Sequence, residues 1–445
     1  MQSIEDATVR KLYWHILPLI LTCYVIAYLD RNNVGFAALQ MNGDLGLTPK
    51  MYAFGGGIFF IGYLLFEVPS NWVIEKVGAR LWITRIMITW GLISGCMALA
   101  HSATSFYVLR FLLGVAEAGF LPGVILYVTK WFPMKHRNRA MGILILGVPM
   151  SFVVGAPISG WLMSLSGGYG LKMWQWLFII EAVPAVLLGL VCSRFLPDRA
   201  ADARWLNDEQ RVWLATKLAD EAAVLRAQSS AVTHASFGSA LLTGRVWAAG
   251  LAYVGINFGT YGISLWLPQI IKAFGVSNLH VGFLTSIPYA AAAISIVLWT
   301  RHADRTHEQR WHAVIPCLVG ALGLAASALT SNPVLAMVAF TVATAGVLTS
   351  MPTLWEVATM SLGGPAAAGG IAMVNSIGQL GGFGGPYLVG FVRETTQSFA
   401  LGMVALAACM VVTATVLYVL AAPKRLASAS LLAAGSPITS GESLS

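Results

Sequence analysis

FYVLRFLLGVAEAGFLPGVILYVTKW, residues 106–131, is the stretch of sequence that decides the fold. It is apolar and long enough to cross a bilayer as a helix, which needs about 20 residues. It nevertheless contains Arg110 and Glu117, although a charge at the centre of a bilayer costs at least about 2.5 kcal/mol. These two residues are about two helical turns apart and share a face with Gly114. We therefore predict that this face is turned inward, towards other helices of a bundle.

The buried charges of this stretch allow two interpretations. Arg110 and Glu117 could form a structural ion pair that only holds the bundle together. Alternatively, the arginine could be part of an anion site and the glutamate could carry a proton. The rest of the chain has to decide between these two hypotheses.

The composition of the chain indicates an integral membrane protein made of helices. The 445 residues are 57% hydrophobic and only 10% charged, and the mean hydropathy is +0.73. Soluble proteins of this size carry far more charge on their surface. The apolar runs do not alternate with polar residues, which excludes a transmembrane β-barrel. The pI near 9.3 does not indicate nucleic-acid binding, because the basic residues lie between the apolar runs.

Apolar runs predict twelve transmembrane helices in two six-helix halves. We expect residues 1–196 to form the N-terminal half, 197–240 a cytoplasmic linker, 241–422 the C-terminal half and 423–445 a disordered tail. The helical spacing of Trp205, Leu206, Val212, Trp213 and Leu218 predicts an amphipathic helix in the linker. The predicted spans are residues 16–39, 52–74, 81–100, 106–131, 140–165, 173–196, 245–271, 281–301, 312–330, 334–358, 367–392 and 399–421.

The distribution of Lys and Arg predicts that both termini are cytoplasmic. With this orientation, Lys50, Lys172, Lys272 and Arg393 are the basic residues of the outer loops, and the other loops with basic residues lie inside. The two halves also show a weak repeat, because an acid stands next to a base after span 2 and after span 8. We predict a cytoplasmic gate from these clusters, although ordinary positive-inside loops would look similar. The gate residues are Glu75, Lys76, Arg80, Asp304 and Arg305.

Four motifs resemble the major facilitator superfamily and, within it, the anion:cation symporter family. The resemblance covers residues 10–422 and is most specific in the first half, where Glu75-Lys76 replaces the usual Asp-Arg pair. It is closest to the branch of tartrate, phthalate and 4-hydroxyphenylacetate permeases. The motifs are YLDRNNVGFA (residues 28–37), EVPSNWVIEKVGAR (67–80), RFLLGVAEAGFLPG (110–123) and WFPMKHRNRAMG (131–142).

The resemblance implies a secondary active transporter of the bacterial inner membrane. Its activity would be proton-coupled uptake of a small organic anion, such as a tartrate-like dicarboxylate or an aromatic carboxylate, by alternating access. It assigns proton coupling to Asp30 and Glu117. It assigns substrate binding to Arg31, Arg110, Tyr28, Tyr63, Trp355 and Asn375.

Physical chemistry supports the same assignments independently. Arg31 and Arg110 are the cations predicted deep in the membrane, and a guanidinium binds a carboxylate through two hydrogen bonds. Proton coupling needs a carboxyl group whose proton affinity changes with its surroundings. The other site residues keep structural alternatives: the tyrosines and Trp355 could be core aromatics, and Asn375 could bond to another helix.

Other functions are also compatible with the sequence. An exporter or exchanger of metabolites or drugs would use the same fold, and a transporter-like membrane sensor is a third possibility. We expect no enzymatic activity, because no catalytic set and no metal site can be assembled from the sequence. The expected partners are a small carboxylate, protons and the lipid bilayer, with no nucleic acid and no cofactor besides the proton. We expect the monomer to be the functional unit.

Overall fold

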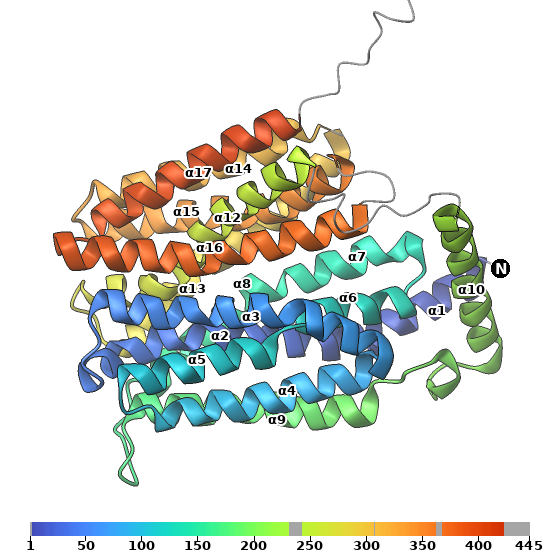
Figure 1. Cartoon of the computed structure of the whole chain (residues 1–445), viewed down its shortest axis with the longest axis horizontal. Helices are drawn as coiled ribbons and strands as arrows, with labels where there is room; N and C mark the ends of the chain where they lie inside the picture. The colour runs from blue at the N-terminus through green and yellow to red at the C-terminus, as the bar shows by residue number, and fades with distance from the viewer. Residues whose placement is uncertain (1, 231–242, 307, 362–366, 422–445) are drawn as a thin grey trace, which may run out of the picture.

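The computed structural model describes residues 2–230, 243–306, 308–361 and 367–421, and these form a bundle of helices (Figure 1). The expected C-terminal tail, residues 423–445, lies outside the described residues. The helices of the first half are α1 (Gln2–His15), α2 (Leu17–Asp44), α3 (Pro49–Val77), α4 (Ala79–Cys96), η1 (Met97–Leu99), α5 (Ala103–Glu117), α6 (Phe120–Trp131), α7 (Met134–Ile145), α8 (Gly147–Leu162) and α9 (Met173–Phe195). The later ones are η2 (Ala200–Asp202), α10 (Asp208–Ser230), α12 (Gly244–Lys272), α13 (Asn278–Thr306), α14 (Arg310–Ala328), α15 (Pro333–Ser361), α16 (Ala367–Thr396) and α17 (Ala400–Leu420).

The helices confirm the predicted twelve-span bundle in two six-helix halves. Within the described residues, ten helical segments are long and apolar enough to cross a membrane. The other two spans are α12 and α16, which are 29 and 30 residues long. They are less apolar because they lie at the interior of the bundle, where α12 and α16 pack on each other and on helices of the first half. Figure 1 shows α2–α9 below and α12–α17 above.

Residues 2–15 precede the first predicted span and form α1. This helix continues almost directly into α2 through Ile16, whose side chain is fully buried. Spans 4 and 5 are also each built from two helices instead of one. The apolar pattern of the sequence runs through these breaks and therefore did not predict them.

Span 4 breaks at Gly119, directly after the predicted charged stripe. Gly119 has a φ of 87°, and a Cβ atom there would lie 1.9 Å from the Ser70 hydroxyl oxygen. Ser70 donates a hydrogen bond of 2.7 Å to the carbonyl oxygen of Ala118, which the break leaves without a helical partner. The indole N–H of Trp82 donates to Ser70 at 2.8 Å. The break therefore places Glu117 at the C-terminal end of α5.

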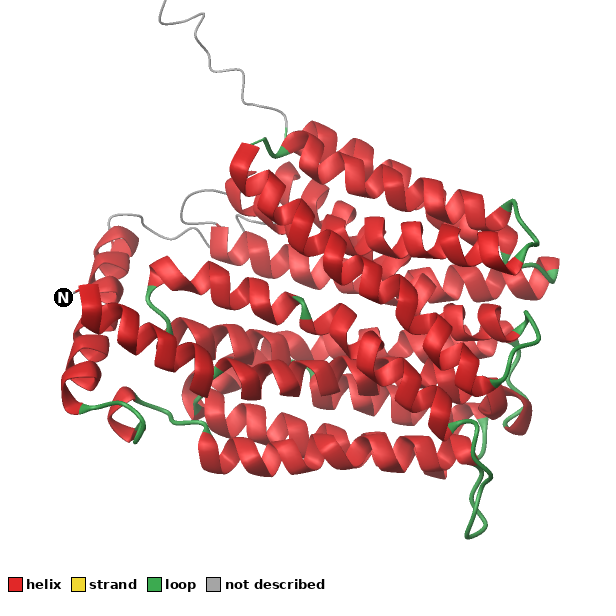
Figure 2. Ribbon diagram, turned by 180° about the vertical axis from the view of Figure 1, so that it is seen from behind, coloured by secondary structure: helices red, strands yellow, loops and turns green. Residues whose placement is uncertain are grey.

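The predicted amphipathic helix of the linker exists as α10, but its register differs from the prediction. Trp205 and Leu206 lie before the helix, which begins at Asp208. Val212 is 66% exposed, whereas Leu214 is fully buried. The helix lies across one end of the bundle (Figure 2), where Lys11 donates hydrogen bonds of 2.9 Å to Trp205 and Gln210. The described part of the linker, up to Ser230, is thus bonded to the first half.

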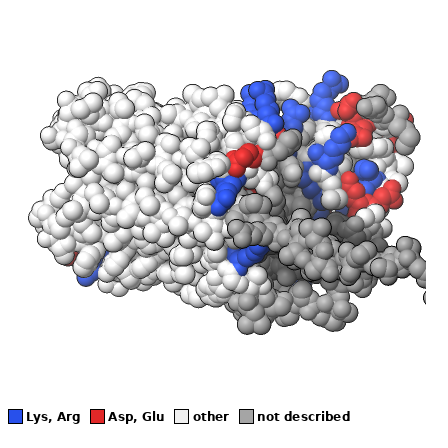
Figure 3. Space-filling model, turned by 90° about the horizontal axis from the view of Figure 1, so that it is seen from above, with Lys and Arg blue, Asp and Glu red and all other residues white. Residues whose placement is uncertain are grey.

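The two halves are joined at the end of the bundle that lies away from α10. There, the backbone N–H of Lys50 donates to Glu394 at 2.9 Å, which ties the start of α3 to the end of α16. Gly160 of α8 packs directly on the backbone of Gly282 of α13. On the face shown in Figure 3, charged side chains gather towards the α10 end. The junction between the halves is therefore made mostly of uncharged, closely packed helix ends.

Candidate functional site

The centre of the site is an ion pair between Arg31 of α2 and Glu117 at the end of α5. Arg31 is 8% exposed and Glu117 is fully buried. The Nη1 atom of Arg31 also donates a hydrogen bond of 2.9 Å to the hydroxyl oxygen of Tyr261, which belongs to α12. Because α12 is part of the second half, this guanidinium lies at the interface between the two halves.

Aromatic rings surround the Arg31 guanidinium. Its central carbon lies 4.6 Å from the ring centre of Tyr28, 5.2 Å from that of Phe59 and 5.7 Å from that of Tyr63. Desolvated cation–π contacts of this kind contribute about 2 kcal/mol. The structure thus brings Tyr28 and Tyr63 to the cation, as the resemblance implies, and adds Phe59, which the sequence analysis did not single out.

Arg110 is fully buried but does not pair with Glu117 in this structure. Its Nε and Nη2 atoms donate long hydrogen bonds of 3.4 and 3.3 Å to the carbonyl oxygens of Gly55 and Gly56 in α3. Its guanidinium lies 5.0 Å from the centre of the Phe59 ring. Both arginines therefore contact the same aromatic side chain, and the charged face of α5 is turned inward as predicted.

The charged groups of the site retain unused hydrogen-bonding capacity. Within the described part of the chain, Arg31 Nε, Arg110 Nη1 and Glu117 Oε2 are buried and have no hydrogen-bond partner. A buried polar atom without a partner is costly, so these atoms indicate where a ligand or water would be bound. Two guanidinium groups with free N–H groups are suited to a carboxylate.

Asp30 points away from its neighbour Arg31, so the two do not form a pair. Adjacent residues of a helix are rotated by about 100° from each other, and Asp30 is fully buried inside the first half. Neither of its carboxylate oxygens has a hydrogen-bond partner among the described residues. Its electrostatic neighbours are the carboxyl groups of Glu181 and Glu117 and the indole N–H of Trp90.

The two predicted site residues of the second half contact other side chains. Trp355 is half-buried, and its ring packs edge-on against Tyr253 with 5.1 Å between ring centres. The amide of Asn375 in α16 donates a hydrogen bond to Glu67 Oε1 in α3. Glu67 is 3% exposed, so it lies between the halves and not at a membrane edge. Its charge within an apolar run was the signal that could have placed it here.

Among the described side chains, the predicted cytoplasmic gate residues Lys76, Arg80, Asp304 and Arg305 do not pair with one another in this structure. Arg80 makes an ion pair of 2.9 Å with Asp198, which follows α9. The Lys76 amine lies 3.4 Å above the ring of Trp72. Asp304 and Arg305 are exposed at the end of α13, and the Glu75 side chain lies outside the described residues. The described cluster of the first half is therefore held by partners within that half.

Comparison with known proteins identifies the family. The chain matches the Major Facilitator Superfamily over residues 20–386. It is 48% identical to a protein named "Putative tartrate transporter" of Agrobacterium vitis, over 94% of this chain and 92% of that protein. It is 41% identical to "Putative metabolite transport protein NicT" of Pseudomonas putida, over 92% and 93%. It is also 40% identical to a "Quinolone resistance transporter" of Acinetobacter baumannii, over 90% and 92%.

The fold also matches solved transporter structures. The inward open conformation of the xylose transporter XylE from E. coli has a TM-score of 0.73 and 14% identity, and covers 94% of this chain and 99% of that one. The fold, the family match and the transporter relatives together show a membrane transporter and not an enzyme. The chain belongs to the Major Facilitator Superfamily, and its similarity to these relatives is consistent with the anion:cation symporter branch.

Proposed function

We propose that this protein carries out proton-coupled symport of a small organic anion. The observation that supports this most directly is that Arg31 and Arg110 are buried and have N–H groups without partners among the described residues. Arg31 is also paired with the Glu117 carboxylate at the interface between the halves. An anion that enters the membrane needs such cations, because leaving its charge unpaired in an apolar medium is very costly.

The surroundings of the two arginines favour a carboxylate as substrate. The guanidinium groups of Arg31 and Arg110 lie 5.2 and 5.0 Å from the centre of the same ring, Phe59, so a dicarboxylate of the tartrate type could engage both of them. Tyr28, Phe59 and Tyr63 also offer ring faces against which an aromatic carboxylate could pack. The tartrate name of two relatives at 48% identity makes tartrate the first substrate to test.

Competition for Arg31 provides a mechanism of coupling. In the absence of substrate, the Arg31 guanidinium neutralises Glu117. A substrate carboxylate that takes over this guanidinium leaves Glu117 without its cation in a buried position. Glu117 then becomes neutral by taking up a proton, because an unpaired buried charge is disfavoured. Release of the substrate restores the ion pair and expels the proton, and Asp30 takes part as a second buried carboxyl group.

The proposed topology places both termini and α10 in the cytoplasm of a bacterium, with the bundle in the inner membrane. The halves, residues 1–196 and 241–422, would then be joined at the periplasmic end, where Lys50 bonds to Glu394. This structure would accordingly face the cytoplasm. Alternating access requires the opposite state, in which the gate clusters around Arg80 and Asp304 approach each other.

Uptake into proteoliposomes tests this proposal. Purified protein should accumulate labelled tartrate, or an aromatic carboxylate from a small panel, when the outside is acidified. A protonophore that collapses the proton gradient should reduce accumulation to simple equilibration. If binding of a carboxylate is measurable but accumulation is the same with and without the gradient, proton-coupled symport is wrong.

Exchange or export on the same fold is the second candidate function, because one relative is named a quinolone resistance transporter. Counterflow from preloaded vesicles distinguishes it from symport. An exchanger would take up labelled substrate only against an internal substrate, and an imposed proton gradient would not replace the internal substrate.

A further inference from the structure

The buried charges of the spanning helices do not balance. Six charged side chains are buried deep in the described part of the bundle, and the carboxyl groups outnumber the cations two to one. Because the net charge of such a cluster has to be close to zero in an apolar medium, about half of the carboxyl groups must carry protons. The six residues are Arg31, Arg110, Asp30, Glu67, Glu117 and Glu181.

Glu181 of α9 is a buried carboxyl group that the proposed coupling mechanism does not use. Its side chain is 3% exposed, and the Ser159 hydroxyl of α8 donates a hydrogen bond of 2.6 Å to Glu181 Oε1. Its other oxygen, Oε2, is buried without a hydrogen-bond partner among the described residues. No cation pairs with it in the described bundle. An ionised Glu181 would therefore be an uncompensated charge.

Asp30 of α2, a helix that packs on α9, is a buried carboxyl group whose charge interacts with that of Glu181. Both its oxygens are buried and lack a hydrogen-bond partner within the described residues, as does Glu181 Oε2. One proton between two neighbouring carboxyl groups would give each of them a partner and remove one negative charge. Three helices that pack on α9 could bring further acidic or basic side chains near Glu181: α2, α4 and α8. Asp30 of α2 is the acidic one at the level of Glu181. Helix α8 has no acidic or basic side chain, and the arginines of α4 lie near its N-terminus, away from Glu181.

We propose that Glu181 holds a second transported proton and shares it with Asp30, behind the anion site. This proposal rests on proton-coupled symport as the proposed function. It assigns to Glu117 the proton that is taken up when substrate binds, and to the Asp30–Glu181 pair a proton that is held inside the first half.

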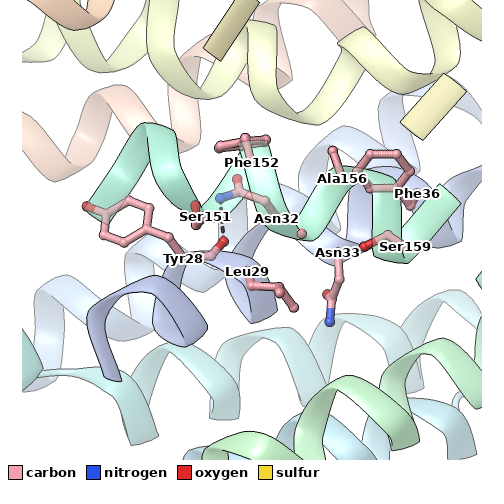
Figure 4. Close-up of a pocket in the computed structure, with 10 residues that line it drawn as sticks. Tyr28, Leu29, Asn32, Asn33, Phe36, Ser151, Phe152, Ala156 and Ser159 are labelled. Carbon is pink, nitrogen blue, oxygen red and sulfur yellow. Dashed lines mark hydrogen bonds between the residues drawn. The ribbon is translucent and has the colours of Figure 1, made fainter. Parts of the chain in front are cut away.

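A small cavity lies between α2 and α8, lined by neighbours of both the pair and the anion site (Figure 4). It has a volume of about 10 Å³, which is the space that one water molecule needs. Tyr28, which packs on Arg31, lines one end, and Ser159, which bonds to Glu181, lines the other. Asn33 lies beside Ser159, and its buried amide has no hydrogen-bond partner among the described residues. A water there would lie between Ser159, which bonds to Glu181, and Tyr28, which packs on Arg31.

Infrared spectroscopy of the purified protein tests the protonation of Glu181 without any transport. At neutral pH, the spectrum should contain the C=O stretch of a buried protonated carboxyl group, and Glu181→Gln should remove it. The matched control is Glu209→Gln, which changes an exposed glutamate of α10 and should leave the band in place. A spectrum in which Glu181→Gln leaves every such band unchanged would overturn the proposal. Because no substrate is used, this outcome is independent of whether symport occurs.

Ser159→Ala provides a second variant in case Glu181→Gln does not fold. It removes the hydrogen bond to Glu181 and keeps the carboxyl group, so the band should shift in frequency and not disappear. An unshifted band would show that it does not belong to Glu181. In proteoliposomes, Glu181→Gln should lower the number of protons moved per substrate by one, as measured from the reversal potential. An unchanged proton number would show that Glu181 holds its proton permanently.

Discussion

The two halves share a fold but differ in what they bury. The first half buries all six charged side chains found deep in the described bundle, and Arg31, Arg110 and Glu117 meet there. Among its described residues, the second half buries uncharged polar groups at comparable depth, such as Asn257, and the buried His312 lies near the start of α14.

This difference indicates a division of labour between the halves. A charge that stays in the membrane needs a fixed partner, so charged residues are best placed within one rigid half. The facing half can then move against them with uncharged contacts, such as the Tyr261 hydroxyl at Arg31, which cost less to break. We infer that the first half supplies affinity and coupling, whereas the second half closes the site.

The largest effect should come from removing a cation of the first half. Arg31→Ala or Arg110→Ala leaves the substrate carboxylate buried without its partner, which costs about 2 kcal/mol or more, or about 30-fold in affinity. Calorimetric titration with the transported carboxylate measures the loss. The control is Arg393→Ala, which removes a half-buried arginine that lies over Phe399 near the C-terminal end of α16. This variant should bind the carboxylate normally. Near-normal binding by both site variants, with the protein folded, would end the division of labour proposed above.

Neutralising a carboxyl group of the first half should separate coupling from binding. Asp30→Asn or Glu117→Gln imitates a permanently protonated group, so binding should change by no more than about threefold while gradient-driven accumulation is lost. Counterflow of preloaded substrate should persist. The measurement is uptake into proteoliposomes with and without an inward proton gradient. If both variants still accumulate substrate in response to the gradient, these carboxylates are structural partners and the first half does not carry the coupling.

The sequence predicted the charged centre of the first half well because charge is so rare in a membrane helix. Arg31, Arg110 and Glu117 stand out from their apolar surroundings, and each is buried at the inner face of the bundle. The pairing between them was beyond the sequence, since Arg31 bonds to Glu117 across two helices and not to its neighbour Asp30. Such contacts depend on helix rotation, which a single side-chain pattern does not determine.

The second half was harder to predict for the same physical reason. Its site-facing side chains, such as Tyr253 and Tyr261, resemble ordinary core aromatics in the sequence. The structure shows Tyr261 at Arg31 and places Asn375 on Glu67, a contact between halves that no local motif indicates. The breaks at Gly119 and near Leu146 were also hidden, because apolar residues continue through them.

A moderate effect is expected from the uncharged contact that the second half makes with Arg31. Tyr261→Phe removes one hydrogen bond and keeps the ring, so apparent affinity should fall by about fivefold, or about 1 kcal/mol. Gradient-driven accumulation should survive, because no carboxyl group is changed. Tyr387→Phe, which alters a ring stacked on Phe383 in α16, is the matched control. A Tyr261→Phe protein that binds but no longer couples would assign coupling to both halves.

The smallest effect should come from the titratable cluster of the second half, at the loop between α13 and α14. Glu308 Oε2 lies 3.0 Å from His312 Nδ1, and the other ring nitrogen of His312 lies 2.7 Å from His302 Nδ1. Burial raises the pKa of Glu308, but the backbone N–H groups of Trp311 and His312 and the His312 ring outweigh it, so this pKa is lower than its usual value of 4.5.

A lowered pKa means that the folded protein favours the ionised carboxylate, so this contribution to stability is present above about pH 4.5 and is lost as the pH falls through the lower folded-state value. Because Glu308 is 39% exposed, Glu308→Gln should lower the free energy of unfolding by at most about 1 kcal/mol at pH 7. The difference in melting temperature from the unaltered protein should shrink as the pH is lowered below 4.5. Asp220→Asn, at an exposed carboxylate of α10, controls for the loss of one charge.

Uptake by Glu308→Gln should be unchanged, since the cluster of Glu308, His312 and His302 lies outside the proposed proton path. A loss of gradient-driven uptake by Glu308→Gln would show that titration in the second half also drives transport, and would contradict the contrast between the halves.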